Sequence, residues 1–312
     1  MIAARLVLGT AQWGGPYGIA NRDGPPPAPE RARLLACAQA AGVRALDTAR
    51  AYGASEARLG AALAGGAARF AIGTKLAPDA CPPGASAAEV CARTERSLAE
   101  SRAALGVARL DALLLHRAAH RRAAGGAAWA RLCAERRAGA IGRLGVSATS
   151  PAEAWDALED PTVERVQVAT SLLDQRLLRA GFFAAAAARG VEVQVRSAFL
   201  QGAALLPPDA LPPALAPLCA PLARVRRFAA AHGLPLPALL LGFVAAIPGV
   251  SLVVGVERAA QLEAHLQAGA AIARAARLQR VLAGLVPPLP DAVLDPWRWP
   301  PAEPAHQSRE SA

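Results

Sequence analysis

The chain alternates short apolar runs with longer amphipathic runs, and this alternation limits the possible folds more than any other feature. The short runs are rich in apolar residues and mostly bounded by Gly, Pro or polar residues, as buried parallel strands are. They cover residues 5–10, 43–47, 69–75, 110–116, 141–147, 163–168, 191–195 and 251–256. Helix-like segments separate them, at 30–42, 55–64, 86–105, 125–138, 151–159, 175–189, 220–232, 235–246 and 258–268.

Eight such strand–helix units predict an α/β fold, a (β/α)8 TIM barrel in a single domain. The alternative is an open doubly wound sheet, which binds dinucleotides at a GxGxxG turn between its first strand and helix. Here the first strand leads into GTAQWGGPYG, which does not open a helix, so the barrel is favoured. We expect residues 1–286 to form the barrel and 287–312 to be a Pro-rich C-terminal tail, loosely packed or disordered.

The charge of the chain raises the question of a nucleic-acid partner. The formal net charge is +10, but the basic residues are scattered singly or in pairs and form no Lys/Arg-rich block. Aromatic residues make up only 4%, which leaves few platforms for stacking bases. We therefore expect no nucleic-acid partner.

Cysteine use and hydropathy bear on location. The five cysteines include no CxxC pair, and the N-terminal residues lack an apolar signal region, so we expect reduced thiols, no metal site and a cytoplasmic protein. The uncharged stretch 233–256 is long enough to span a bilayer. Its prolines and the pair Pro248-Gly249 divide it, which favours a buried helix followed by a strand, with no membrane contact.

Three successive strand-like runs end in an ionisable residue: Asp47, Lys75 and His116. In a parallel barrel the carboxyl ends of the strands share one face, where active sites lie. Tyr52 follows Asp47 by five residues and can fold over the same rim, and Lys75 is the only lysine in the chain. Singly, these residues have ordinary explanations as a helix cap, a solvated lysine, a core histidine and a loop anchor. Together they predict one pocket.

These four side chains suit the reduction of a carbonyl group. A hydride that reaches the carbonyl carbon places negative charge on the oxygen, so a proton donor is needed there. A free tyrosine has a pKa near ~10, and a nearby ammonium lowers it. A carboxylate keeps the lysine in place and charged, and a histidine near the carbonyl oxygen polarises the substrate.

The segments ALDTARAYG, GTK, LLLHR, GVS, VQV, RSAFLQG and GVERAAQLE resemble the aldo/keto reductase family, over about Arg5 to Gly269. The resemblance implies a (β/α)8 barrel that binds a nicotinamide cofactor, usually NADPH, without a Gly-rich turn. It further implies Tyr52 as general acid/base, Lys75 as the group that tunes its pKa, Asp47 as partner of the lysine, and His116 as the residue that orients the substrate.

The resemblance also assigns cofactor positions. Ser147 and Gln167 look like the pair that holds the nicotinamide carboxamide. The loop along the pyrophosphate supplies Arg196, Ser197, Leu200 and Gly202, and the turn at the adenosine ribose and its 2′-phosphate supplies Gly255, Glu257, Arg258 and Gln261.

This chain departs from the family pattern at four positions: Ala148, Arg196, Glu257 and His265. Arg196 stands where many members stack an aromatic ring on the nicotinamide. Glu257 stands where a basic residue often meets the 2′-phosphate; a carboxylate there repels a phosphate and can accept a hydrogen bond from a free 2′-hydroxyl. NADPH is thus the family expectation, and NADH is the hypothesis that Glu257 raises.

Substrate contacts are expected from the loops above the rim, in particular from Trp13 and Tyr17, and the substrate is expected to be a small carbonyl or alcohol. Two other functions stay open at this point. One is a non-catalytic subunit that binds nicotinamide nucleotides and senses redox state. The other is a barrel enzyme that uses Lys75 to form a Schiff base.

Overall fold

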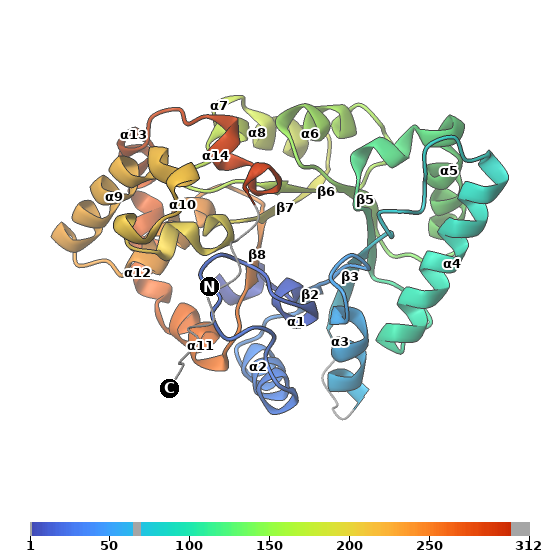
Figure 1. Cartoon of the computed structure of the whole chain (residues 1–312), viewed down its shortest axis with the longest axis horizontal. Coiled ribbons are helices and arrows are strands. Elements are labelled where there is room, and N and C mark those ends of the chain that lie inside the picture. The colour runs from blue at the N-terminus through green and yellow to red at the C-terminus, as the bar shows by residue number, and fades with distance from the viewer. Residues whose placement is uncertain (1, 65–69, 301–312) are drawn as a thin grey trace, which may run out of the picture.

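The computed structural model describes residues 2–64 and 70–300, and it contains a closed barrel of eight parallel strands that follow one another in sequence order (Figure 1). The strands are β1 (Leu6–Gly9), β2 (Ala45–Asp47), β3 (Ala71–Lys75), β4 (Ala112–Leu115), β5 (Leu144–Ser147), β6 (Arg165–Ala169), β7 (Glu192–Arg196) and β8 (Ser251–Gly255). The predicted (β/α)8 TIM barrel is confirmed.

The strands form where the sequence is apolar because both of their faces are covered. All four residues of β4 are buried, and so are all four of β1 and of β5. The register places Gly9 beside Asp47 and Asp47 beside Gly73, so that Lys75 extends two residues beyond the level of Asp47. Successive side chains of a strand alternate between faces, so Gly73 and Lys75 share one.

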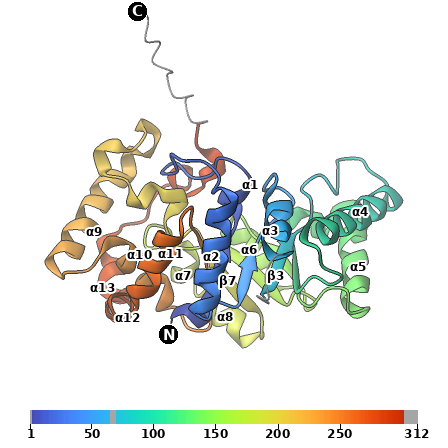
Figure 2. The same cartoon turned by 90° about the horizontal axis from the view of Figure 1, so that it is seen from below.

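Helices surround the barrel in both views (Figures 1 and 2). The α-helices are α1 (Ala11–Gly14), α2 (Ala28–Ala40), α3 (Ser55–Ala64), α4 (Ala87–Leu105), α5 (Ala123–Arg137), α6 (Pro151–Leu158), α7 (Arg176–Arg179), α8 (Phe182–Ala188), α9 (Cys219–Ala231), α10 (Leu236–Ala245), α11 (Ala259–Gln267), α12 (Gly269–Arg277), α13 (Gln279–Leu285) and α14 (Asp291–Leu294). Short 3₁₀ helices are η1 (Ile2–Arg5), η2 (Ala118–Arg121), η3 (Leu200–Leu205), η4 (Pro208–Ala210), η5 (Pro213–Leu218) and η6 (Pro296–Arg298).

One predicted helix is divided in the structure. The segment 175–189 forms α7 and α8, because Gly181 between them adopts φ 75°, in the left-handed region. Such a residue interrupts helical hydrogen bonding, and glycine adopts this conformation without steric cost.

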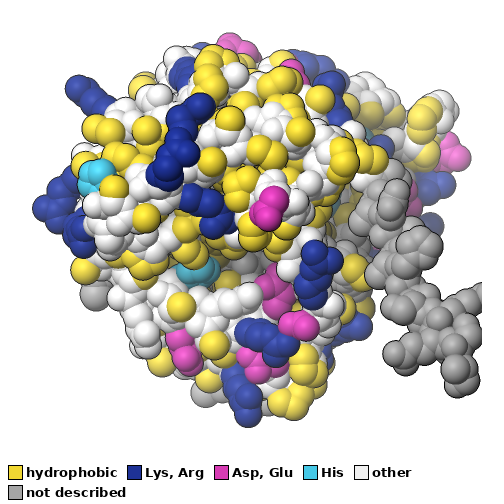
Figure 3. Space-filling view, turned by 60° about the vertical axis from the view of Figure 1, so that its left-hand side comes forward, with side chains coloured by type: hydrophobic (Ala, Val, Ile, Leu, Met, Phe, Trp, Pro, Cys, Tyr) yellow, Lys and Arg dark blue, Asp and Glu magenta, His cyan; other side chains and the backbone are white. Residues whose placement is uncertain are grey.

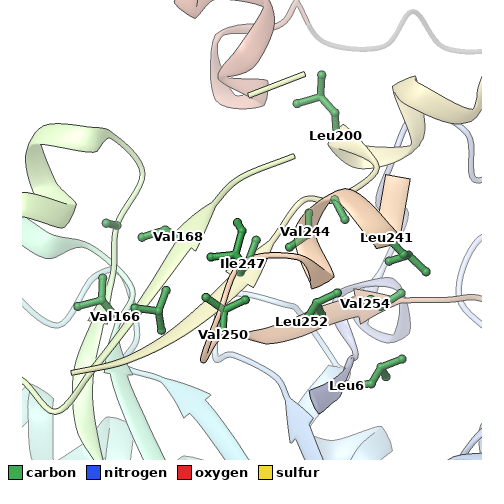
Figure 4. Packing of buried hydrophobic residues seen from close by; sticks show 14 of the residues in the cluster. Leu6, Val166, Val168, Leu200, Leu241, Val244, Ile247, Val250, Leu252 and Val254 are labelled. Carbon is green, nitrogen blue, oxygen red and sulfur yellow. The ribbon is translucent and has the colours of Figure 1, made fainter. Parts of the chain in front are cut away.

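The uncharged stretch 233–256 forms α10 and then β8, as predicted. Figure 4 shows the side chains of Leu241 and Val244 on α10 among those of Leu252 and Val254 on β8. On its other side α10 lies against α12, where a Cβ at Gly242 would stand 2.5 Å from the Ala275 Cβ, so only glycine fits. Within the described residues, no single helix is long and apolar enough to cross a membrane. Two segments together reach that length and composition, but the chain bends by 100° between them: Pro213–Ala231 and Leu236–Ala245.

The segment that begins at residue 287 packs more closely than expected. Val293 and Leu294 of α14 are buried, and Asp295 forms an ion pair with Arg176 at 2.9 Å. The sequence predicted a loose tail because its prolines obscure this short helix. The remainder of the predicted tail, 301–312, lies outside the described residues.

Charged side chains are dispersed over the face shown in Figure 3, where basic and acidic groups alternate with apolar ones. Much of the positive charge is paired. Arg136 and Glu164 lie 2.8 Å apart, and Arg165 and Glu192 lie 2.6 Å apart.

Candidate active site

Asp47 and Lys75 form a buried ion pair at the carboxyl ends of β2 and β3. Lys75 Nζ lies 2.9 and 2.8 Å from the two carboxylate oxygens of Asp47, and it also donates to the Thr48 carbonyl at 3.0 Å. Only 1% of the Lys75 side chain is exposed. Burial alone would lower the pKa of Lys75, but the negative charges of Asp47 and Tyr52 and their hydrogen bonds raise it above its ordinary value. Lys75 is therefore held as an ammonium.

Tyr52 completes this cluster from the loop after β2. Its hydroxyl lies 3.3 Å from Lys75 Nζ, and the ammonium stands 4.9 Å from the centre of its ring. The loop approaches α1 so closely that a Cβ at Gly14 would lie 1.4 Å from the Tyr52 carbonyl oxygen. The hydroxyl of buried Ser55 donates to the Thr10 carbonyl at 2.8 Å, which ties the loop to the end of β1.

His116 stands next to Tyr52, immediately after β4. The two ring centres are 5.9 Å apart and the rings are nearly perpendicular, at 83°. Burial, followed by the charges of Lys75, Arg196 and other nearby cations, lowers the pKa of His116 from 6.5 to about 3. The imidazole is therefore neutral near pH 7, so it can donate one hydrogen bond without carrying charge. The four residues predicted to share one pocket, three from strand ends and Tyr52 from a loop, thus lie together.

A cavity of about 550 Å³ opens beside this cluster. Asp47, Tyr52, Tyr17 and Arg196 line one part of it. The other predicted residues on its wall are Ser197, Gly202, Gly255, Glu257 and Gln261. Phe199 and His265, which stack with ring centres 5.5 Å apart, also line it. The β7 loop and the turn after β8 therefore border the same space as Tyr52.

Ser147, at the end of β5, and Gln167, in the middle of β6, are buried and do not line the cavity. The Gln167 amide nitrogen donates to Asp47 at 2.8 Å and to Gln194 at 3.1 Å. Its carbonyl oxygen is buried and has no hydrogen-bond partner among the described residues. A buried acceptor of this kind is costly unless a ligand or water satisfies it.

The turn before α11 is held by acidic groups from another part of the chain. Glu30 on α2 accepts a hydrogen bond from the Ala259 backbone N–H at 2.6 Å, and Asp23 forms an ion pair with Arg258. The Gln261 side-chain oxygen accepts from the backbone N–H groups of Glu257 and Arg258, at 2.8 and 3.0 Å. The helix N-terminus, which ordinarily attracts anions, is therefore already bonded to the protein's own groups.

Seven of the predicted residues are not among those that line the cavity: Trp13, Lys75, His116, Ser147, Gln167, Leu200 and Arg258. Trp13 is fully buried in the hydrophobic core, because α1 begins directly after β1 and directs the indole inward. The side chain of Leu200 is also part of the core, among the residues of Figure 4. The geometry thus gives the side chains of Trp13 and Leu200 no ligand contact.

Sequence reasoning missed Gln12 and Glu30. Gln12 lines the cavity, and its side-chain oxygen is buried with no partner in the described part of the chain. Its place three residues after β1 was a usable signal, since polar residues just beyond strand ends face the same mouth. Glu30 carried no such signal, because it is 229 residues away from the N–H that it binds.

Comparison with known proteins now adds to this geometry. Residues 5–280 match the model of the aldo/keto reductase family. The chain belongs to the aldo/keto reductase family. No curated protein sequence matches it. Membership makes the chain an oxidoreductase that acts on carbonyl compounds, in a family that generally uses nicotinamide cofactors.

Solved structures agree with this aldo/keto reductase fold. A Pseudomonas aeruginosa protein assigned to the aldo-keto reductases is 25% identical, with a TM-score of 0.63 over 87% of this chain and 90% of that one. An aldo-keto reductase of Bacillus halodurans in its holo form is 20% identical, with a TM-score of 0.68 over 93% and 95%. The glycerol dehydrogenase of Gluconobacter oxydans is also 20% identical, with a TM-score of 0.66 over 92% and 94%. At 20% identity the last two support the fold alone.

Proposed function

We propose that this aldo/keto reductase interconverts a small carbonyl compound and its alcohol with a nicotinamide cofactor, and that Tyr52 is the general acid/base. The observation that carries the proposal is the 3.3 Å contact between the Tyr52 hydroxyl and Lys75 Nζ. An ammonium at this distance can stabilise the negative charge that the phenol oxygen gains as it donates its proton.

Each member of the cluster then has a task. When bound, the reduced nicotinamide supplies a hydride to the carbonyl carbon. The Tyr52 hydroxyl donates a proton to the carbonyl oxygen, and Lys75 stabilises the phenolate that remains. Asp47 holds the ammonium through two hydrogen bonds, and neutral His116 donates to the same carbonyl oxygen.

Lys75 is poorly suited to form a Schiff base. A nucleophilic lysine must be neutral, and it must reach the substrate carbonyl. Lys75 Nζ is held by both Asp47 oxygens and by Thr48 and Tyr52, with 1% of its side chain exposed, and its pKa is raised. Carbonyl reduction, in which the ammonium stays in place, fits this environment better.

The residues of the cavity fit a nicotinamide dinucleotide. The unpartnered oxygen of Gln167 can accept from the carboxamide, with Ser147 beside it on the neighbouring strand. Residues of the 197–202 loop and the stacked pair of Phe199 and His265 line the cavity and are suited to contact the pyrophosphate and the adenine. The volume of about 550 Å³ lies within the usual range for such ligands.

We further propose that NADH is preferred over NADPH. Glu257 faces the cavity at the turn that the family uses for the 2′-phosphate. The Ala259 N–H is already bonded to Glu30, and Arg258 is paired with Asp23. A phosphate dianion would therefore meet the carboxylate of Glu257 without a free cation to offset it, whereas a free 2′-hydroxyl can donate to Glu257.

The test of catalysis follows reduced-nicotinamide absorbance with a panel of aldehydes and ketones. The Tyr52→Phe variant keeps the ring and removes the proton donor, so we expect kcat to fall by about 10²–10⁴-fold. NADH binding, measured by fluorescence, should stay close to that of the wild type. Equal kcat values for the two proteins would refute the role of Tyr52. A protein that binds NADH and reduces no carbonyl would instead act as a nucleotide-sensing subunit.

The test of cofactor choice measures dissociation constants for NADH and NADPH. We expect the wild type to favour NADH, and Glu257→Gln to tighten NADPH binding while NADH binding changes little. Glu263→Gln is a matched control, because this residue lies on α11 but does not line the cavity. A strong NADPH preference in both the wild type and Glu257→Gln would contradict the proposal.

A further inference from the structure

Arg196 is a cation at the reacting end of the cavity, and no carboxylate of residues 2–64 and 70–300 pairs with it. It ends β7 and lines the cavity together with Tyr17 and Tyr52. Its guanidinium donates to two neutral acceptors, the Ala148 carbonyl at 3.0 Å and the Ser197 hydroxyl at 3.2 Å. Arg136, Arg165 and Arg176, which lie away from the cavity, each pair with Glu or Asp instead.

The other cation near the reacting groups is already neutralised. Both oxygens of Asp47 bind Lys75, so this pair contributes little net charge to the cavity. Arg196 thus supplies the uncompensated positive charge on this part of the wall. Half-buried and unpaired charges are uncommon, because removing a charge from water is costly unless a partner compensates for it.

The position of Arg196 indicates where its partner must lie. Arg196 lines the cavity together with Tyr17 and Tyr52, and after burial and Lys75 its positive charge helps to lower the pKa of His116, so it stands close to the rings that surround the substrate carbonyl. The acidic turn with Glu257 and Arg258 belongs to a different segment, after β8. The anion that would pair with Arg196 is therefore expected near the substrate carbonyl, away from the adenosine end of the cavity.

We propose that the natural substrate is a carbonyl compound that also carries a carboxylate, and that Arg196 binds this carboxylate. The inference rests on the proposed carbonyl reduction and adds the substrate class. A guanidinium has five N–H donors, of which two are used here, and its planar fork matches the two oxygens of a carboxylate. Tyr17, on the wall beside it, offers a further hydroxyl to the same group.

The cofactor's pyrophosphate is a second source of anionic oxygens, and the experiment separates the two. The probes are the three isomers of carboxybenzaldehyde and their uncharged methyl esters. For at least one isomer, we expect the wild type to have a higher kcat/KM for the acid than for its ester. In Arg196→Met this kcat/KM should fall by about 10- to 100-fold, mainly through KM, because a charge-assisted hydrogen bond is lost. The fall for the ester should be smaller than the fall for the acid, so the ratio of the two kcat/KM values isolates the contact with the carboxylate.

Two further variants control for folding and for long-range charge. Arg196→Lys keeps the charge without the fork and should retain part of the preference for the acid. Arg117→Met removes a cation that also influences His116 but is exposed and does not line the cavity, so it should preserve the preference. Melting temperatures of all variants identify any that are misfolded, and Arg196→Lys then carries the test.

Several outcomes would overturn the inference. If the wild type prefers no acid over its methyl ester, the proposed substrate class is wrong. Reduction of the aldehyde group of the methyl esters would still support the proposed function. If Arg196→Met lowers acid and ester equally and weakens NADH binding, Arg196 serves the pyrophosphate. If no aldehyde or ester is reduced at all, the proposed function fails and the inference fails with it.

Discussion

Asp47 and Lys75 form a buried ion pair. Removing one of the two charges should therefore lower the free energy of unfolding by more than half of the loss caused by removing both. Asp47→Asn would leave the ammonium with neutral acceptors only, namely the new amide oxygen, Thr48 and Tyr52, and Lys75→Met would leave the carboxylate with the Gln167 amide. The two side chains are 7% and 1% exposed, so each single change leaves a buried, uncompensated charge. Each should lower the free energy of unfolding by about 3–5 kcal/mol.

The double variant Asp47→Asn/Lys75→Met contains neither charge. Its loss should be smaller than the sum of the single losses by about 2–3 kcal/mol. Urea unfolding at pH 7 of the wild type and the three variants measures this difference. The raised pKa of Lys75 means that its contribution is fully present below the ordinary lysine pKa and is lost only as the pH rises through the higher folded value. Measurements at pH 7 and 8 should therefore agree, and losses that add within about 0.5 kcal/mol would refute the reasoning.

Two more outcomes follow from the same cluster. His116 has a pKa of about 3 in the folded chain against 6.5 ordinarily, so the unfolded chain binds more protons between these two pH values. The free energy of unfolding therefore falls as the pH decreases through this range, by at most about 2 kcal/mol at pH 5. Urea unfolding measured against pH should give a flatter profile for His116→Asn than for the wild type. Identical profiles would contradict this. Gly14→Ala would place a methyl group 1.4 Å from the Tyr52 carbonyl oxygen and must displace the loop, so kcat should fall more than NADH affinity; a variant with wild-type kcat would count against the tight packing.

The barrel was predictable because its strands are buried on both faces and so read as apolar runs. The same logic placed Asp47, Lys75 and His116 together, since an ionisable residue at the end of a buried strand has only the mouth of the barrel to face. Tyr52 was harder to place from periodicity alone, because its position depends on the close approach of Gly14 on α1.

Other features depend on local backbone geometry that periodicity does not encode. The break between α7 and α8 results from one left-handed glycine, Gly181, inside an otherwise helical pattern. Leu200 adopts φ 48° after β7, and this turn directs its side chain into the core. The tight turn of α1 after β1 buries Trp13 in the same way. A resemblance in sequence predicts which loop contacts the ligand, but it does not predict the direction of each side chain in that loop.

The turn before α11 marks the limit of reasoning from neighbouring residues. The sequence draws attention to Glu257, whose charge opposes a 2′-phosphate. It gives no reason to connect this residue with Glu30, which lies on α2, or with Asp23 in the loop before it. Closure of the barrel brings β1 beside β8, so the segments that follow these two strands meet at one edge. Glu30 occupies a backbone N–H at the helix N-terminus, and Asp23 pairs with Arg258. Replacing Glu257 by a basic residue should therefore raise the affinity for NADPH only in part. We expect the largest gain in NADPH affinity when Glu30 is replaced as well.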